Sequence, residues 1–180
     1  MVSTESRRKI EVMIAAGRTK HEIFQTLGGT DDIARVVAAT PYLESRMKYK
    51  NLNRILVGII IYYALTKAAF SVAIIATSDV PKYLILLALP IPAAALYIAY
   101  FVNKFYGEFY SVVAMLGLAA FLKGMDLPDG SFNGKAEMIA LAVQLPVLAG
   151  AVIAFVLKKR LCPALGFMGA KTDAAGNYKF

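Results

Sequence analysis

Residues 55–76 read ILVGIIIYYALTKAAFSVAIIA, and this stretch decides the fold class of the chain. Its one charged residue is Lys67. An α-helix needs about 20 apolar residues to cross about 30 Å of hydrocarbon. Three more apolar stretches follow, at 83–102, 105–122 and 138–157. The sequence therefore predicts an all-α fold, a polytopic four-helix transmembrane bundle.

The overall composition also favours a membrane protein. Hydrophobic residues make up 58% of the chain and charged residues 18%, whereas soluble domains average about half apolar and about a quarter charged. The formal net charge of +8 is also typical of nucleic-acid-binding proteins, but orientation in a membrane and attraction to anionic headgroups produce the same excess. We expect the lipid bilayer, and not nucleic acid, to be the partner of these charges.

The basic residues gather on one side of the predicted spans. If residues 1–54 are cytoplasmic, ten Lys and Arg precede the first span, Lys104 lies in the middle turn and five follow the last span, against three in the outer segments. Cytoplasmic segments carry such an excess. We expect an integral protein of the bacterial cytoplasmic membrane with both termini in the cytoplasm.

This orientation divides the chain into three parts. Residues 1–53 form a small cytoplasmic N-terminal helical domain, residues 54–160 the transmembrane bundle, and residues 161–180 a cytoplasmic tail. A domain of about 50 residues buries little core by itself. We therefore expect the N-terminal domain to dock on the bundle or on a neighbouring subunit.

Local signals place the short helices of the N-terminal domain. Thr19 and Glu22 have the spacing of a capping box, and Thr30 is suited to cap the next helix. Pro41 is suited to the first position of a further helix, which we expect to run, with a bend, into the first span.

Two short helices joined by a glycine turn also resemble a DNA-binding helix-turn-helix. The second of these helices opens with Asp31 and Asp32 and carries one cation, Arg35. Carboxylates facing phosphates oppose binding, so the sequence argues against this function.

Lys67 lies near the expected bilayer centre, where a cation costs about 2.5 to 3.5 kcal/mol. Three arrangements are compatible with it. The ammonium snorkels to the outer headgroups, or Gln144 and the hydroxyls of Tyr62 and Tyr63 hold it inside the bundle, or it lines a path for an anion or proton. The sequence leaves these alternatives open.

Prolines interrupt two of the spans, at Pro90 and Pro92 and at Pro146. A proline frees a carbonyl one turn back, so these residues either kink the helices for packing or break them around a transport site. Packing kinks are the simpler interpretation.

The third span carries small residues at every third position, and Glu108 lies at its cytoplasmic end. Such a face lets a neighbouring helix approach closely, and we expect it to mediate association between copies. We expect Glu108 to be solvated or paired with Lys104 or Arg54. The small residues are Ala114, Gly117 and Ala120.

Basic residues flank the bundle on its predicted cytoplasmic side, with aromatic and aliphatic residues interleaved before the first span. They are candidates for contact with lipid headgroups, although they serve equally well to orient the helices. The residues are Arg46, Lys48, Lys50, Arg54, Lys158, Lys159 and Arg160.

The sequence contains no catalytic, phosphate-binding or metal-binding motif. With one histidine, His21, and one cysteine, Cys162, we expect no metal site and no cofactor. The thiol is suited to lipidation by its place after the last basic cluster, but an inert thiol is the simpler hypothesis.

We therefore expect no enzyme but a membrane subunit or scaffold, which assembles with copies of itself or with other membrane-protein subunits. The main alternative is a small ion or solute channel or transporter with Lys67 and Gln144 on its pathway. A third is a membrane-tethered regulator that acts through its N-terminal domain.

Overall fold

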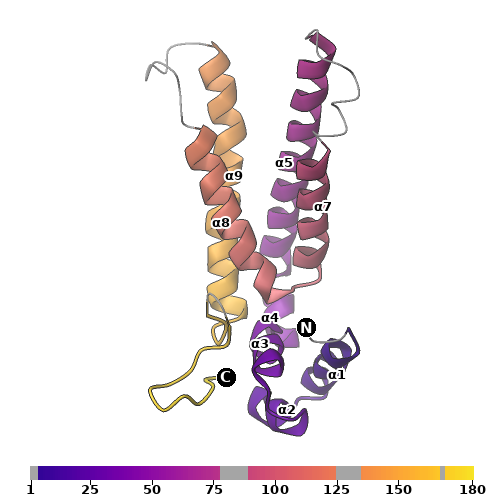
Figure 1. Cartoon of the computed structure of the whole chain (residues 1–180), viewed down its shortest axis with the longest axis vertical. Coiled ribbons are helices and arrows are strands. Elements are labelled where there is room, and N and C mark those ends of the chain that lie inside the picture. Colours follow the sequence, from indigo (N-terminus) through magenta and orange to yellow (C-terminus); the bar gives the residue numbers. More distant parts are fainter. Residues whose placement is uncertain (1–3, 78–88, 125–134, 167–168) are drawn as a thin grey trace.

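The computed structural model describes residues 4–77, 89–124, 135–166 and 169–180. Within these ranges the chain is all-helical, and its extended segments form only two isolated bridges in the C-terminal tail (Figure 1). The helices are α1 (Thr4–Ala15), α2 (Lys20–Thr26), α3 (Asp31–Ala39), α4 (Leu43–Lys48), α5 (Lys50–Thr77), α7 (Pro90–Asn103), α8 (Gly107–Gly124) and α9 (Lys135–Leu161).

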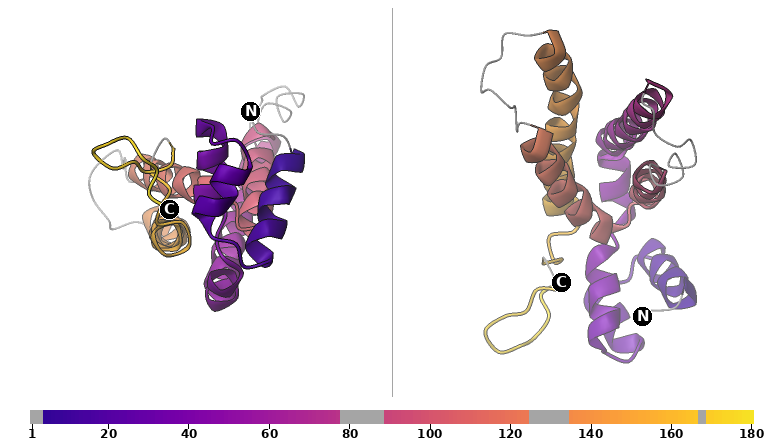
Figure 2. Two further views of the ribbon diagram at one scale, coloured as in Figure 1. Left: turned by 90° about the horizontal axis from the view of Figure 1, so that it is seen from below. Right: turned by 45° about the horizontal axis from the view of Figure 1, so that its top comes forward.

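Helices α1 to α4 form an N-terminal unit at one end of the molecule (Figures 1 and 2). The predicted capping box is present, because Thr19 Oγ1 accepts from the Glu22 N–H at 3.3 Å and Glu22 Oε2 accepts from the Thr19 N–H at 2.9 Å. The side chain of Thr30 caps α3, because its Oγ1 accepts from the Ile33 N–H at 3.4 Å. Gly17 and Gly28 end α1 and α2 with φ angles of 80° and 92°, values that disfavour residues with a Cβ.

The apolar faces of α1, α2 and α3 bury one another. Their shared core consists of Ile10, Ile14, Ile23, Val36 and Val37. Ile10 and Ile14 lie four positions apart, so both are on one face of α1.

The connection to the bundle differs slightly from the prediction. Pro41 is buried and precedes the helix, and α4 begins at Leu43 after the cap residue Tyr42. The chain then breaks at Tyr49 before α5 begins at Lys50. The expected bend is therefore a short break between two helices.

The bundle consists of two antiparallel hairpins, α5 with α7 and α8 with α9 (Figure 1). The hairpins touch near the N-terminal unit and diverge toward the other end (Figures 1 and 2). The core between them at the touching end includes Leu56, Val102, Tyr110, Ala154 and Leu157. The α7–α8 turn contains Phe105 with a φ of 60°.

Two helices are long and apolar enough to cross a membrane within the described residues. The spans are Lys50–Ala73 in α5 and Ala142–Leu161 in α9, with mean hydropathies of 1.9 and 1.6. In the most apolar 18-residue segment of each helix, only 17% and 28% is buried within the chain. An apolar helix so little covered by its own protein differs from the core helix of a soluble domain.

The second expected span, 83–102, is described only in part, because residues 78–88 lie outside the described ranges. Its described part, α7, is a shorter apolar helix of 14 residues. Pro90 and Pro92 lie in the first turn of α7, where a missing N–H costs little. Pro146, in contrast, lies in the interior of its helix, α9.

Candidate functional site

A buried polar cluster lies where the N-terminal unit meets the bundle. Asn53 of α5 is 1% exposed, and its side chain joins α7 to α8. Its Nδ2 donates to the carbonyl of Val102 at 3.0 Å, and its Oδ1 accepts from the hydroxyl of Tyr110 at 2.7 Å. A buried polar group left without a partner costs about 1 to 3 kcal/mol, so this pairing holds the three helices in one register.

An ion pair ties the first helix to the bundle. Arg7 of α1 lies 2.8 Å from Oε1 of Glu108 on α8, and its guanidinium stacks 4.1 Å from the ring of Tyr106. Both charged side chains are only 18% exposed. The sequence predicted Lys104 or Arg54 as the ion-pair partner of Glu108, and this is wrong. The docking of α1 on the bundle places Arg7 beside Glu108 instead.

A second contact joins α2, α3 and the end of α9. Lys20 is 4% exposed and its Nζ donates to the carbonyl of Ala38 at 3.2 Å. The Cys162 thiol donates to the carbonyl of Ala39 at 3.2 Å. Burial lowers the pKa of Lys20 and raises the pKa of Cys162 to about 12, against the smaller opposing effect of the Lys20 charge.

The tightest approach in this region is at Gly107. A Cβ there would lie 2.5 Å from the carbonyl oxygen of Ala39 and 2.6 Å from Sγ of Cys162. Cys162 is thus enclosed by backbone from two elements, and it is 1% exposed. This environment favours the inert thiol over a lipidated one.

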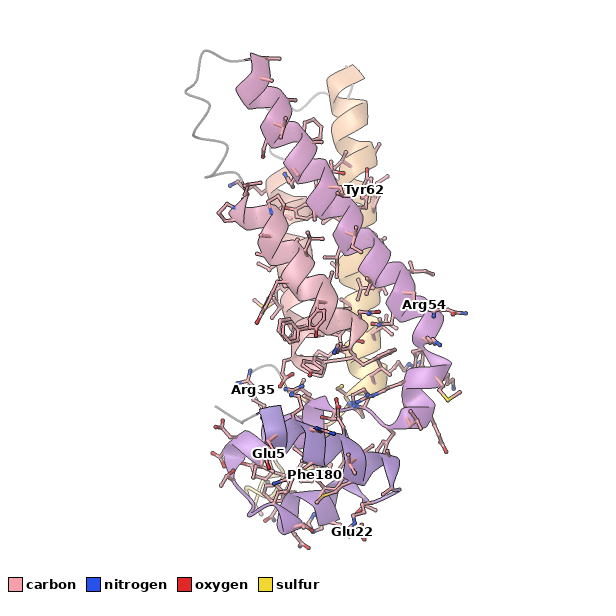
Figure 3. All side chains as sticks on the ribbon, turned by 90° about the vertical axis from the view of Figure 1, so that its right-hand side faces the viewer. Glu5, Glu22, Arg35, Arg54, Tyr62 and Phe180 are labelled. Atoms are coloured by element: carbon pink, nitrogen blue, oxygen red, sulfur yellow. The ribbon has the colours of Figure 1, made fainter. Side chains whose placement is uncertain are left out.

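The C-terminal tail folds back onto the N-terminal unit. The ring of Phe24 contacts Tyr178 and Phe180 at centroid distances of 5.2 and 5.3 Å. The hydroxyl of Tyr178 donates to the carboxylate of Asp31 at 2.5 Å, and this raises the pKa of the phenol. Figure 3 shows Phe180 among the helices of the N-terminal unit. The interacting positions are more than 140 residues apart.

The polar residues that the sequence predicted to lie inside the membrane do not form one cluster. Lys67 is half-buried, with its Nζ 5.6 Å from the ring centroid of Tyr63 one turn earlier. Tyr62 lies on the exposed side of α5 (Figure 3). Gln144 is half-buried on α9, and its Oε1 has no hydrogen-bond partner among the described residues. No hydrogen bond joins Lys67 to Gln144 in the described part of the chain.

An apolar cleft opens between the two hairpins, with a cavity volume of about 390 Å³. All four bundle helices line it, and Gly150 and Ala151 of α9 form part of its wall. Among its lining residues, only Tyr63 and Lys123 carry polar side-chain groups. We call this space the central cleft.

The small-residue face of α8 packs inside the subunit. A Cβ at Gly117 would lie 3.0 Å from the Cβ of Ala151 on α9. Ala114 packs against the bundle core, and Ala120 lines the central cleft. The close approach that the sequence predicted therefore occurs between α8 and α9 of one chain.

The predicted headgroup-contact residues surround the lower end of the bundle. Arg54 is exposed and points away from the helices (Figure 3). Arg46 is half-buried, where its Nε donates to the carbonyl of Pro41 at 3.2 Å and its guanidinium lies 3.7 Å from Glu11. The exposed members of the set are Lys48, Lys50, Arg54, Lys159 and Arg160, and Lys158 is half-buried.

Sequence reasoning missed Asn53, Arg7, Lys20 and Tyr110 as polar residues of the junction. Arg7 and Lys20 lie between polar neighbours in the sequence, and Asn53 and Tyr110 each have an apolar neighbour on one side only, so the sequence gives no signal for their burial. Their partners lie 18 to 101 positions away, so no local pattern identifies the pairing.

No protein-family model matches this chain, and no curated protein or solved structure is significantly similar to it.

Proposed function

We propose that this chain is an integral membrane protein in which α5, α7, α8 and α9 cross the bilayer, with the N-terminal unit and the tail in the cytoplasm of a bacterial cell. It acts as a non-enzymatic subunit or scaffold that assembles with copies of itself or with other membrane-protein subunits.

The membrane location is supported by the exposed faces of the bundle. Large apolar side chains project outward from all four helices, among them Leu65 on α5, Tyr97 on α7, Leu118 on α8 and Phe155 on α9, which are 49% to 62% exposed. Monomeric soluble proteins rarely expose such contiguous apolar surface. The orientation is supported by the excess of basic residues in the terminal segments.

The observation that carries the scaffold proposal is the placement of polar groups. At the junction Asn53 pairs with Tyr110 and Arg7 with Oε1 of Glu108, whereas Oε2 of Glu108 and Oε1 of Gln144 are buried without a hydrogen-bond partner among the described residues. The central cleft is apolar except at Tyr63 and Lys123. An ion pathway needs polar groups or water along one axis, whereas a scaffold needs them paired. The regulator hypothesis is weaker, because the N-terminal unit is fastened to the bundle.

A channel or transporter remains the second candidate, and Lys67 is the observation that favours it. Its ammonium is half-buried within an apolar helix, next to Tyr63, whose ring lines the cleft. A charge in a narrow, low-dielectric pathway would dominate the barrier to ions.

Reconstitution separates the two candidates. We expect purified protein in proteoliposomes to pass no measurable ions or protons, and Lys67→Met to insert and assemble as the wild type does. Native mass spectrometry of protein released from nanodiscs should show two or more copies or a stoichiometric second subunit. The matched control is Lys159→Met, at an exposed position outside the cleft.

A conductance that disappears in Lys67→Met but persists in Lys159→Met would replace the scaffold with the channel. A strictly monomeric protein without flux and without a second subunit would also contradict the scaffold proposal.

A further inference from the structure

We propose that the central cleft binds one phospholipid with an anionic headgroup, taken from the leaflet opposite the N-terminal unit. The proposal rests on the proposed function, because it requires the bundle to span a membrane. It names one specific lipid ligand, whereas a membrane-spanning bundle by itself implies only general contact with lipid.

The cleft has the size and polarity of an apolar ligand site. Its volume of about 390 Å³ lies within the range of about 300 to 1,000 Å³ typical of small-molecule pockets. The walls are mostly aliphatic, including Ile59, Ile91, Ile98 and Val147. Water gains few hydrogen bonds in such a space, so hydrocarbon is the occupant that fits these walls.

The length of the cleft matches one leaflet. On α8 its lining residues run from Val113 to Lys123, and a helix rises about 1.5 Å per residue, which gives about 15 Å. This is half of the roughly 30 Å of bilayer hydrocarbon. The apolar part of the cleft can therefore hold an acyl chain from its ester end to the bilayer midplane.

Positive charge stands at the end of the cleft far from the N-terminal unit. Lys123 lines this end and is exposed. Lys67 lies on the opposite hairpin, one turn beyond the cleft residue Tyr63. Within residues 50–73, 90–123 and 142–161, the one carboxylate is Glu108, near the other end and paired with Arg7. A phosphate that carries a net negative charge complements these ammonium groups.

A helix from another subunit fits the cleft less well. An α-helix with its side chains is about 10 Å across. One acyl chain is thinner, and it enters sideways from the bilayer because the hairpins diverge (Figure 2).

Competition between two lipids tests the proposal. The full-length protein in mild detergent is incubated with equal amounts of phosphatidylglycerol and phosphatidylcholine of the same acyl chains, and retained lipid is measured by native mass spectrometry. We expect phosphatidylglycerol to be retained about fivefold more per contributing lysine. Lys123→Gln should reduce this preference about fivefold, and Lys159→Gln, at the exposed opposite end of the bundle, should leave it unchanged.

A second pair of variants tests the acyl chain. Ala94 of α7 lines the cleft, whereas its neighbour Ala93 is exposed outside it. Ala94→Phe should fill the cleft and reduce retention of both lipids, and Ala93→Phe should behave as wild type. Equal retention of the two lipids by wild type, or equal retention by the two Phe variants, would overturn the proposal. Loss of oligomers in Ala94→Phe without any bound lipid would overturn it in favour of a second copy.

Carbonate extraction of membranes separates the two proposals. Protein that resists extraction but retains no lipid contradicts only the lipid site. Protein released by carbonate contradicts the membrane-spanning bundle, and the lipid site with it.

Discussion

At the scale of single residues, the junction between the N-terminal unit and the bundle depends on polar groups that satisfy one another. Asn53, buried among apolar side chains, uses both ends of its amide. Cys162 uses its thiol to reach the carbonyl of Ala39. Each of these groups is costly if its partner is removed, so the junction resists small displacements.

The buried thiol predicts a specific alkaline weakness. Burial raises the pKa of Cys162 to about 12 from 9.0, so its contribution to stability is complete below about pH 9 and is lost as the pH rises toward the folded pKa. The slope is at most about 1.4 kcal/mol per pH unit. Between about pH 8 and about pH 10.5, the thermal midpoint of wild type should fall more than that of Cys162→Ser.

Differential scanning fluorimetry at several pH values measures this difference. The serine hydroxyl keeps a donor for Ala39 and does not titrate in this range, so the variant isolates the thiol. Parallel pH profiles of the two proteins would show that the thiol does not titrate through a folded pKa of about 12.

Local residue signals were predictable, and long-range ones were not. Thr19 and Glu22 lie three positions apart, and their capping box is confirmed. Glu108 was assigned to cations near it in sequence or in the expected topology, but its partner Arg7 lies 101 positions away. Only the docking of α1 brings these two residues together.

At the scale of helices, α8 and α9 form the most closely packed pair of the bundle. The absence of a Cβ at Gly117 permits this approach, since a Cβ would already lie 3.0 Å from that of Ala151. Close packing over small residues favours helix association in lipid, where burial of apolar side chains gives no hydrophobic gain because the tails already solvate them.

Gly117→Leu should therefore weaken the folded bundle. We expect a loss of about 1 to 3 kcal/mol from overpacking, measured as a lower thermal midpoint in detergent, with no change in the number of copies. Gly58→Leu is the matched control, because a Cβ at Gly58 meets nothing within 4 Å.

Two outcomes would contradict this expectation. An equal effect of the two substitutions would show that the α8–α9 contact is not limiting. A shift to smaller assemblies in Gly117→Leu alone would restore the interface between copies that the sequence predicted.

The sequence identified the helices because each has a clear apolar period or run. Hydrophobicity did not reveal how the helices pair, since α5 and α9 are apolar on almost every side. The short break at Tyr49 also lacked a Gly or Pro signal, and α4 and α5 were expected to be continuous with a bend.

At the scale of the whole molecule, the orientation in the membrane is open to a direct test. Cys162 is buried, so in the folded protein it will react slowly on either side and serves as a silent background. Ser131→Cys, between α8 and α9, should react with a membrane-impermeant maleimide in intact cells. Gln25→Cys, at an exposed position of α2, should react only after permeabilisation.

The reverse pattern of labelling would invert the proposed topology. Labelling of both positions in intact cells would contradict a sealed arrangement with the N-terminal unit inside. The proposed orientation comes from the positions of the basic residues in the sequence. The central cleft could not be predicted from hydropathy, because it arises from the divergence of two hairpins.

The contact of Phe24 with Tyr178 and Phe180 has a consequence for biogenesis. The N-terminal unit leaves the ribosome first, but these aromatic partners are synthesised only after α9. Contacts between residues so far apart along the chain form late in folding. The N-terminal unit therefore completes its packing only after the last helix has been made, so a chain stalled before that point presents an unfinished aromatic surface to chaperones and proteases.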